Sequence, residues 1–186
     1  MARGGRETAV EGVEDSGDFA RKRRRVLTPD AFARRLCNVS LDDLVERGIR
    51  GVIVDLDNTL VAYGEEHLSP ADAAWIQRAL TRGFRICLVS NNFTERVARV
   101  ARELGVPAIS SALKPLPRGF SRALRVLGTA REHTIVVGDQ LFTDVLGAKL
   151  LGLHAILTEP LVASDWLGTR LLRFLERIVL RRNGKR

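Results

Sequence analysis

The segment GVIVDLDNTLV, residues 51–61, places two aspartates at the end of an apolar run. The run Gly51–Leu56 has the length of a strand, and its nearly continuous apolar character is typical of a strand buried on both faces of a parallel sheet. Asp55 and Asp57 lie one residue apart at its C-terminal end. Neighbouring carboxylates in a buried position repel each other unless a cation or hydrogen-bond donors compensate their charge. The segment therefore predicts a chemical role for this strand end.

Apolar runs and amphipathic segments alternate along the chain from residue 51 onward. Repeats of this kind predict an α/β fold, a Rossmann-like three-layer sandwich with a mainly parallel five-stranded sheet. The expected strands are Gly51–Leu56, Arg85–Ser90, Val106–Ile109, Thr134–Gly138 and Ala155–Leu157. The expected helices are Ser69–Arg82, Thr94–Leu104, Pro117–Leu127 and Leu141–Leu151.

The chain before this sheet divides into an arm and the start of the folded domain. Residues 1–25 are charged and glycine-rich and end in RKRRR, so we expect a disordered basic arm. The folded domain would comprise residues 26–163 and begin with two extra helices. Thr28 followed by Pro29 is a typical start for the first of them, and Ser40 would cap the second.

The amino-acid composition restricts the classes of protein to which this chain can belong. Hydrophobic residues make up 45% of the 186, enough for a real core, and no apolar stretch approaches the 18 residues of a membrane span. The first residues contain no apolar segment of the secretory type, so we expect a cytoplasmic protein. Cys37 and Cys87 have neither metal-site nor redox spacing, which predicts two reduced thiols.

The C-terminal residues carry most of the net charge of +8. Residues 161–186 contain seven Lys or Arg against two Asp or Glu, and we expect a basic amphipathic helix and tail at 164–186. Such a helix favours peripheral contact with an anionic membrane, here the inner membrane surface. The alternative is that its apolar face packs on the domain while the arginines stay solvated. The basic stripe consists of Arg170, Arg173, Arg177 and Arg181.

Polar residues follow each of the first four predicted strands. In an open parallel sheet, ligands bind beyond the carboxyl ends of the strands, so these residues would share one rim. Several carboxylates in one crevice call for a cation, and an all-oxygen set suits Mg²⁺ together with a phosphate group. Ser90 and Lys114 would then hold that phosphate. The rim residues are Asp55, Asp57, Ser90, Asn91, Lys114, Asp139 and Asp144.

These motifs, in this order, resemble those of the haloacid dehalogenase superfamily. The stretch DLDNT at 55–59 is similar to its DxDxT motif, and Ser90, Lys114 and the pair Asp139/Asp144 match the later three. The finer pattern, with SNN at 90–92 and GDQLFTDV at 138–145, resembles the YqeG-type branch of subclass IIIA. Mitochondrial phosphatidylglycerophosphate phosphatases are similar to that branch.

The resemblance implies a role for each of the matching residues. Asp55 would be the nucleophile that forms an aspartyl-phosphate, and Asp57 the acid and base that protonates the leaving oxygen and then activates water. Asp55, Asp139 and the Asp57 carbonyl would bind Mg²⁺. Asp144 and Thr59 would support the site from behind. Ser90, Asn91 and Lys114 would contact the phosphoryl group.

The motif spacing leaves no room for an inserted cap domain. Asp57 and Ser90 are 33 positions apart and Ser90 and Lys114 are 24 apart, and one strand–helix unit uses up each interval. A capless site should be open on one side, so a large substrate or a surface would have to exclude water.

The expected function is therefore Mg²⁺-dependent hydrolysis of a phosphomonoester. A lipid of the phosphatidylglycerophosphate type is the leading substrate. A protein associated with RNA or the ribosome, with a secondary phosphatase site, is the alternative, and its binding would weaken steeply with salt. A phospho-acceptor signalling module fits less well, because Asp57 lies where it would promote turnover.

Overall fold

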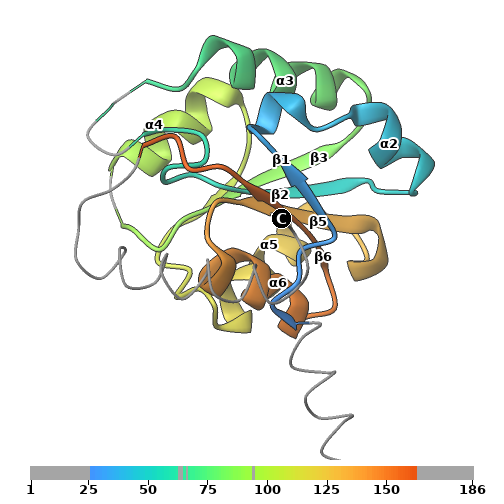
Figure 1. Cartoon of the computed structure of the whole chain (residues 1–186). Coiled ribbons are helices and arrows are strands. Elements are labelled where there is room, and N and C mark those ends of the chain that lie inside the picture. Colours follow the sequence, from blue (N-terminus) through green and yellow to red (C-terminus); the bar gives the residue numbers. More distant parts are fainter. Residues whose placement is uncertain (1–25, 63–64, 66, 94, 163–186) are drawn as a thin grey trace, which may run out of the picture.

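Six parallel strands form the centre of the described domain, with helices on both faces (Figure 1). The computed structural model describes residues 26–62, 65, 67–93 and 95–162. The strands are β1 (Ala31–Ala33), β2 (Gly51–Asp55), β3 (Arg85–Val89), β4 (Ala108–Ile109), β5 (Thr134–Gly138) and β6 (His154–Thr158). The α-helices are α2 (Leu41–Glu46), α3 (Pro70–Thr81), α4 (Glu95–Leu104), α5 (Pro117–Leu127) and α6 (Leu146–Leu150). Short helices of other types are η1 (Leu36–Asn38), η2 (Arg131–His133) and η3 (Leu141–Val145).

The predicted fold class is confirmed, although the sheet has six strands instead of five. The prediction of a first helix at Thr28 and Pro29 was wrong, because Ala31–Ala33 forms β1 and pairs in parallel with β6. Asp30 explains the difference: its amide donates to the Ala155 carbonyl at 2.8 Å and its carboxylate accepts from the Ala155 amide at 2.7 Å. These tertiary hydrogen bonds outweigh a local capping signal.

The second extra helix agrees with the prediction. It is α2, whose capping residue Ser40 accepts a hydrogen bond from the Asp43 amide at 3.1 Å. Gly48, with a φ of 71°, follows the end of this helix in the left-handed conformation that favours glycine. The predicted arm at 1–25 and the predicted C-terminal helix and tail at 164–186 lie outside the described residues.

The strand order β1-β6-β5-β2-β3-β4 places the predicted rim at one edge. From β2 the chain first adds β3 and β4 on one side, then crosses to add β5 and β6 on the other. The register pairs Asp55 with Val89 and Val54 with Val137, so the carboxyl ends of β2, β3 and β5 lie level. Connections that leave in opposite directions open a crevice between β2 and β5, which is where such sheets bind ligands.

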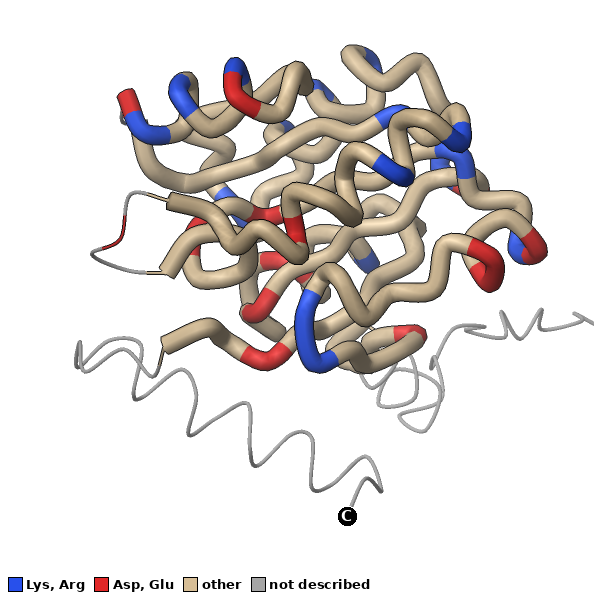
Figure 2. The backbone as a smooth tube through the Cα atoms, turned by 90° about the horizontal axis from the view of Figure 1, so that it is seen from above, with Lys and Arg blue, Asp and Glu red and all other residues tan. Residues whose placement is uncertain are grey.

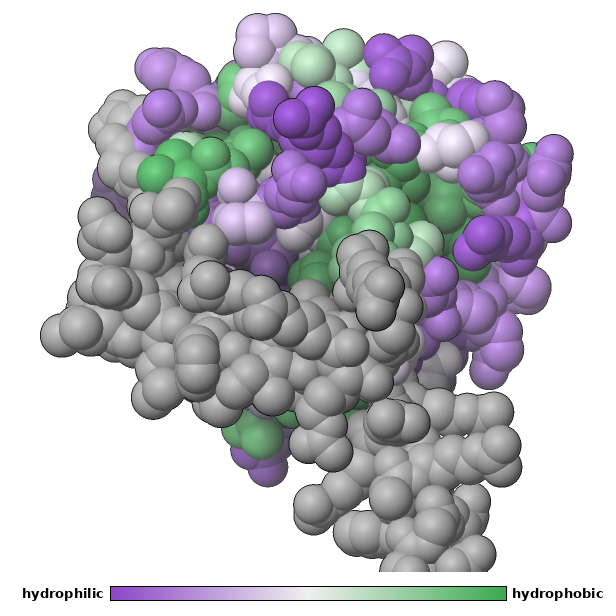
Figure 3. All heavy atoms as spheres, in the orientation of Figure 1, coloured by the Kyte–Doolittle hydropathy of each residue, from purple (hydrophilic) through white to green (hydrophobic). Residues whose placement is uncertain are grey.

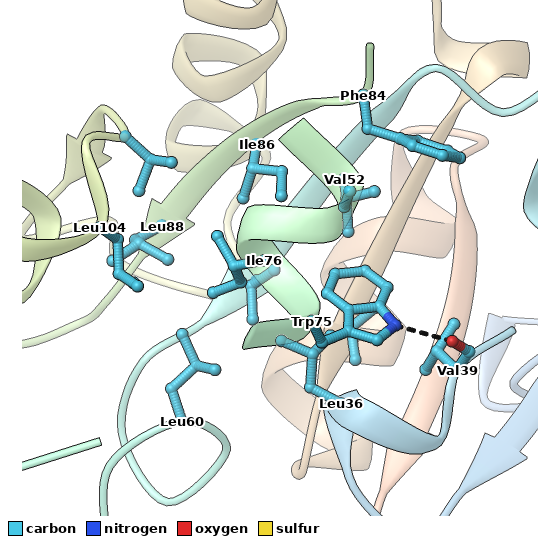
Figure 4. Packing of buried hydrophobic residues seen from close by; sticks show 14 of the residues in the cluster. Leu36, Val39, Val52, Leu60, Trp75, Ile76, Phe84, Ile86, Leu88 and Leu104 are labelled. Atoms are coloured by element: carbon cyan, nitrogen blue, oxygen red, sulfur yellow. Dashed lines mark hydrogen bonds between the residues drawn. The ribbon is translucent and has the colours of Figure 1, made fainter. Parts of the chain in front are cut away.

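Alternating side chains of the strands supply two apolar cores, one on each face of the sheet. Val52 and Val54 belong to the cluster under α3, whereas Ile53 belongs to the cluster that includes Phe120 of α5. Figure 4 shows the first core, where the indole of Trp75 donates to the Val39 carbonyl at 2.7 Å. Full burial on both faces is what the uninterrupted apolar strands predict.

The helix predicted at Leu141–Leu151 is divided in the structure. Its first part, η3, is a π-helix in which the Val145 amide donates to the Gln140 carbonyl at 3.3 Å. Regular helix, α6, begins at Leu146. Single π-turns are frequent at functional sites. Within the described ranges, no helix is long and apolar enough to cross a bilayer.

Candidate active site

The structure brings the predicted rim residues together at the carboxyl edge of the sheet. Figure 2 shows several acidic segments close together in the middle of the domain. Each of the charged rim residues is buried, although charged side chains are rarely buried without partners. The buried polar residues of this edge are Asp55, Asp57, Asn58, Thr59, Ser90, Lys114, Asp139 and Asp144.

Three of these aspartates form one carboxylate cluster. Asp55, Asp139 and Asp144 each offer an oxygen, and the three oxygens lie within 4.8 Å of one another. Oδ2 of Asp55 is buried, and the described residues give it no hydrogen-bond partner. An unpartnered buried carboxylate oxygen costs free energy, and a cation is the partner that suits a cluster of like charges. The donor set, all carboxylate oxygen, fits a hard divalent ion such as Mg²⁺.

Lys114 provides the positive charge of the cluster. Its ammonium donates to Oδ1 of Asp55 and, at 2.6 Å, to Oδ1 of Asp144. Burial raises the pKa of the Asp55 carboxyl well above its usual range; Lys114 opposes the rise, whereas Asp144 and Asp139 add to it. Burial alone would lower the pKa of Lys114, but Asp144 and Asp55 raise it above its ordinary value. Among the described residues, this one ammonium contacts two of the three clustered carboxylates, Asp55 and Asp144.

Asn91 fixes the backbone that carries Lys114. The Lys114 amide donates to Oδ1 of Asn91 at 2.6 Å, and Nδ2 of Asn91 donates back to the Lys114 carbonyl at 3.2 Å. Leu113, the preceding residue, has a φ of 56°, a conformation that side chains other than glycine adopt rarely. The amide of Asn91 therefore holds the lysine loop in place, and its predicted contact with phosphate remains a prediction.

Both carboxylate oxygens of Asp57 have partners. Ser90 Oγ and, at 3.0 Å, Asn92 Nδ2 donate to Oδ2. The guanidinium of Arg96 on α4 donates to Oδ1 and also, at 3.2 Å, to the Glu65 carbonyl. Sequence reasoning missed Arg96, although a basic residue in the first turn of the helix that follows SNN was a usable signal. These contacts hold the Asp57 side chain in one orientation.

Asn58 is the second residue that sequence reasoning missed. Its φ of 65° lies in the left-handed region, which asparagine tolerates better than most residues. Its Nδ2 donates to Asp139 at 3.3 Å and to the Val162 carbonyl at 2.9 Å, and its Oδ1 accepts from the Val162 amide at 2.9 Å. Thr59 donates more weakly to Asp139 at 3.5 Å. Asn58 thus joins the segment after β6 to the carboxylate cluster.

Gly138 makes room for Asp144. A Cβ at position 138 would lie 2.4 Å from Cγ and Oδ2 of Asp144, closer than any real contact. The same Oδ2 accepts from the Gln140 amide at 3.1 Å. Asp144 was predicted to support the site from behind; the structure places one of its oxygens in the cluster and on Lys114.

The two stretches of chain between the site motifs were predicted to be too short for a cap domain, and each contains one helix and one strand. Between Asp57 and Ser90 the described residues form α3 and β3, and between Ser90 and Lys114 they form α4 and β4. Within the described ranges, no further domain is inserted beside the site.

Comparison with known proteins defines the class of this protein as a phosphoric monoester hydrolase. The chain belongs to the haloacid dehalogenase-like hydrolases, whose family model matches residues 62–152. That span contains Ser90, Lys114, Asp139 and Asp144, and the Asp55/Asp57 motif comes directly before it.

Two relatives align with most of this chain. "Probable phosphatase YqeG" of Bacillus subtilis is 38% identical over 157 residues, which cover 84% of this chain and 91% of the relative. "Phosphatidylglycerophosphate phosphatase 1, chloroplastic/mitochondrial" of Arabidopsis thaliana is 28% identical over 189 residues, which cover 96% of this chain. The alignment spans 54% of the plant protein, so the chain corresponds to about half of that relative's length.

A solved structure supports the fold assignment. NagD from E. coli matches with a TM-score of 0.53 at 16% sequence identity, over 62% of this chain and 90% of that chain. Identity at this level speaks for the shared α/β fold alone.

Proposed function

We propose that the chain is a Mg²⁺-dependent phosphomonoester hydrolase that acts through an aspartyl-phosphate at Asp55. The observation that carries the proposal is the state of the Asp55 carboxylate. One oxygen accepts from Lys114, and the other is buried beside two further carboxylates, with no hydrogen-bond partner among the described residues. A carboxylate held in this way has one oxygen available for a metal ion and lies where the phosphoryl group would meet Lys114.

The proposed reaction has two steps. In the first, an Asp55 oxygen attacks phosphorus, the bond from phosphorus to the ester oxygen breaks, and Asp57 gives that leaving oxygen a proton. In the second, Asp57 takes a proton from water, the water oxygen attacks phosphorus, and the bond to Asp55 breaks to release phosphate. Ser90, Asn92 and Arg96 orient Asp57 throughout, because all three donate to its carboxylate.

The metal ion would be held by the carboxylate cluster. Asp55 and Asp139 would supply carboxylate oxygens and Asp57 its backbone carbonyl, while Asp144 would hold Lys114 from the opposite side. Mg²⁺ bound there would neutralise the carboxylates and the charge that develops on the phosphoryl oxygens. Lys114 and Ser90 would contact that group, and Asn91 would keep the lysine loop in register.

A large phosphorylated substrate, in the first place a lipid of the phosphatidylglycerophosphate type, is the proposed substrate class. The likeness to the plant phosphatase supports this class, and so does a site without an inserted cap between its motifs. Such a substrate would bring a cytoplasmic protein to the inner membrane surface. An RNA- or ribosome-associated role is the alternative, which the following experiment separates from the first.

The test is a phosphatase screen of the full chain against lipid, nucleotide, sugar and aryl phosphates, with and without Mg²⁺. Turnover of a lipid phosphate well above that of the soluble esters, lost in Asp55→Asn and in excess chelator, is the expected result. Hydrolysis that persists in Asp55→Asn would contradict the mechanism, and a preference for RNA ends or nucleotides would favour the alternative.

A further inference from the structure

Three strongly exposed apolar side chains lie on the loops that carry the site. Phe93 is 84% exposed and directly follows Asn92, which binds Asp57. Leu113 and Leu116 are 59% and 51% exposed and flank the lysine loop on both sides of Lys114. We name Phe93, Leu113 and Leu116 the apolar rim. Large apolar side chains exposed together beside a polar site mark a surface that another molecule covers.

Exposed apolar surface near the site extends beyond the apolar rim. Val162, which is bonded to Asn58, is a further exposed apolar residue at the edge of the site. Figure 3 shows apolar surface at the left of the domain, beside the grey atoms. In Figure 1, which has the same orientation, β2 and β6 run toward this side. The exposed apolar surface thus borders the place where phosphate would bind.

A hollow with apolar walls adjoins the apolar rim at Phe93. It has a volume of about 370 Å³ and lies between α4 and β4. Its walls are mostly small side chains, with Glu95 and Ser110 as the polar members. The apolar lining is formed by Phe93, Val97, Ala98, Ala101 and Ala108.

Positive charges adjoin the apolar rim at Leu116, whereas Glu95 lies beside Phe93. Helix α5 begins one residue after Leu116 and carries three exposed arginines and no acidic residue. Arg118 and Arg122 lie in its first two turns, near the same edge of the sheet, and Arg125 follows one turn later. A partner that covers this surface must combine apolar groups and negative charges, a combination that an anionic phospholipid bilayer offers; a phosphomonoester lipid in that bilayer would supply the substrate.

We infer that the apolar rim docks the enzyme on an anionic phospholipid bilayer, with the site facing the headgroups. The inference rests on the proposed phosphatase function, because it takes the phosphate site to be the part that faces the membrane. Phe93, Leu113 and Leu116 enter the boundary between headgroups and acyl chains, and Arg118 and Arg122 contact lipid phosphates. The bilayer then covers a site between whose motifs the described residues insert no cap.

The test compares vesicle binding of three full-length proteins. The rim variant is Phe93→Asn/Leu113→Asn/Leu116→Ser; asparagine tolerates the left-handed backbone at 113, and serine suits the helix-capping position at 116. The matched control is Val126→Gln/Leu150→Gln, whose side chains are 51% and 53% exposed on α5 and α6. Each protein is sedimented with phosphatidylglycerol/phosphatidylcholine vesicles, and its hydrolysis of p-nitrophenyl phosphate is measured in parallel.

The expected result is that the rim variant binds the anionic vesicles roughly tenfold or more weakly than the parent, because up to three apolar side chains no longer insert. The control should bind like the parent, and all three proteins should hydrolyse the soluble ester at similar rates. Binding by the rim variant equal to the parent, or equal loss in the control, would overturn the inference. So would a parent that binds structured RNA but no vesicles.

The two proposals fail in different ways. A parent without metal-dependent hydrolysis of the aryl ester contradicts the proposed function, whatever its vesicle binding. A parent that hydrolyses the ester normally but binds vesicles independently of the apolar rim contradicts the docking inference alone.

Discussion

Two Asp–Lys pairs in this domain consist of the same chemical groups, but the protein shifts the pKa of their aspartates in opposite directions. Asp30 accepts from Lys149 at 2.6 Å and from the Ala155 amide at 2.7 Å. Burial alone would raise the pKa of Asp30, but these hydrogen bonds outweigh it and lower the pKa below its usual value. Asp55 also accepts from a lysine, Lys114, yet burial and two neighbouring carboxylates raise its pKa.

The difference between the pairs distinguishes a contact that stabilises the fold from one that belongs to the candidate active site. Every described contact of Asp30 favours its charged form, so the pair stabilises the attachment of β1 to β6. Asp55 instead lies in a cluster of three carboxylates, in which the described residues place one ammonium on two of them, so a bound cation would relieve their mutual repulsion. Functional sites commonly violate the rules of stability in this way, and the rest of the fold compensates.

The largest expected effect is that of Asp55→Asn. Turnover should fall by about 10⁴-fold or more, because the amide does not attack phosphorus. In the absence of metal, the same variant should melt at a higher temperature than the parent, because one of three mutually repelling carboxylates is gone; each kcal/mol relieved raises Tm by about 2–4 °C. Steady-state kinetics and calorimetry in chelator measure both. A lower Tm would show that the Lys114 contact outweighs the repulsion.

Asp57→Asn should reduce turnover by about 10²–10⁴-fold, the usual scale for loss of a general acid–base. The loss should be smaller for p-nitrophenyl phosphate than for an alkyl phosphate, because nitrophenolate leaves without protonation. Measuring kcat for both esters tests the assignment, and equal losses would count against it.

Arg96→Leu should lower kcat for the alkyl phosphate by about 10–100-fold, because Asp57 loses the guanidinium that orients one of its oxygens. The KM should change little, since Arg96 contacts the carboxylate and the loop carbonyl of Glu65. Arg96→Lys should retain part of the activity, and Arg102→Leu, an exposed arginine further along α4, is the matched control. A change confined to KM would assign Arg96 to substrate binding instead.

Asp30→Asn should destabilise the fold by about 1 kcal/mol and leave turnover unchanged. This effect is smaller than that of a buried charge-assisted hydrogen bond, because the Asp30 side chain is 31% exposed and water screens the charge. Since the folded pKa is lowered, the contribution is present above the unfolded pKa of about 3.9 and is lost as pH falls through the folded value. Denaturant unfolding at pH 7 and at low pH measures it. A variant as stable as the parent at pH 7 would contradict the comparison.

The site residues at strand ends could be predicted from sequence because parallel strands bring their carboxyl ends to one edge. Asp55, Ser90 and Asp139 each directly follow or end an apolar run, so their convergence needs no knowledge of side-chain directions. Lys114 was placed by its position in a motif. Of the strands, β1 was missed because its pairing depends on Asp30 contacts with a segment 125 residues away.

The residues that sequence reasoning missed or placed differently depend on backbone conformation. Asn58 reaches Asp139 and Val162 only because its φ is positive. Asn91 faces the lysine loop and Asn92 faces Asp57, a choice that the SNN motif leaves open. Arg96 reaches Asp57 from the neighbouring helix, which also carries arginines at 99 and 102, and only the position of Arg96 in the first turn distinguishes it in sequence.

Thermal unfolding with and without Mg²⁺ tests whether the three-carboxylate cluster is a metal site. The parent's Tm should rise in millimolar Mg²⁺, because the ion binds the folded state alone. Asp139→Ala should abolish the rise, and Asp30→Asn should keep it, because Asp30 belongs to the other pair. A parent with no shift in Tm and full activity in excess chelator would contradict the claim.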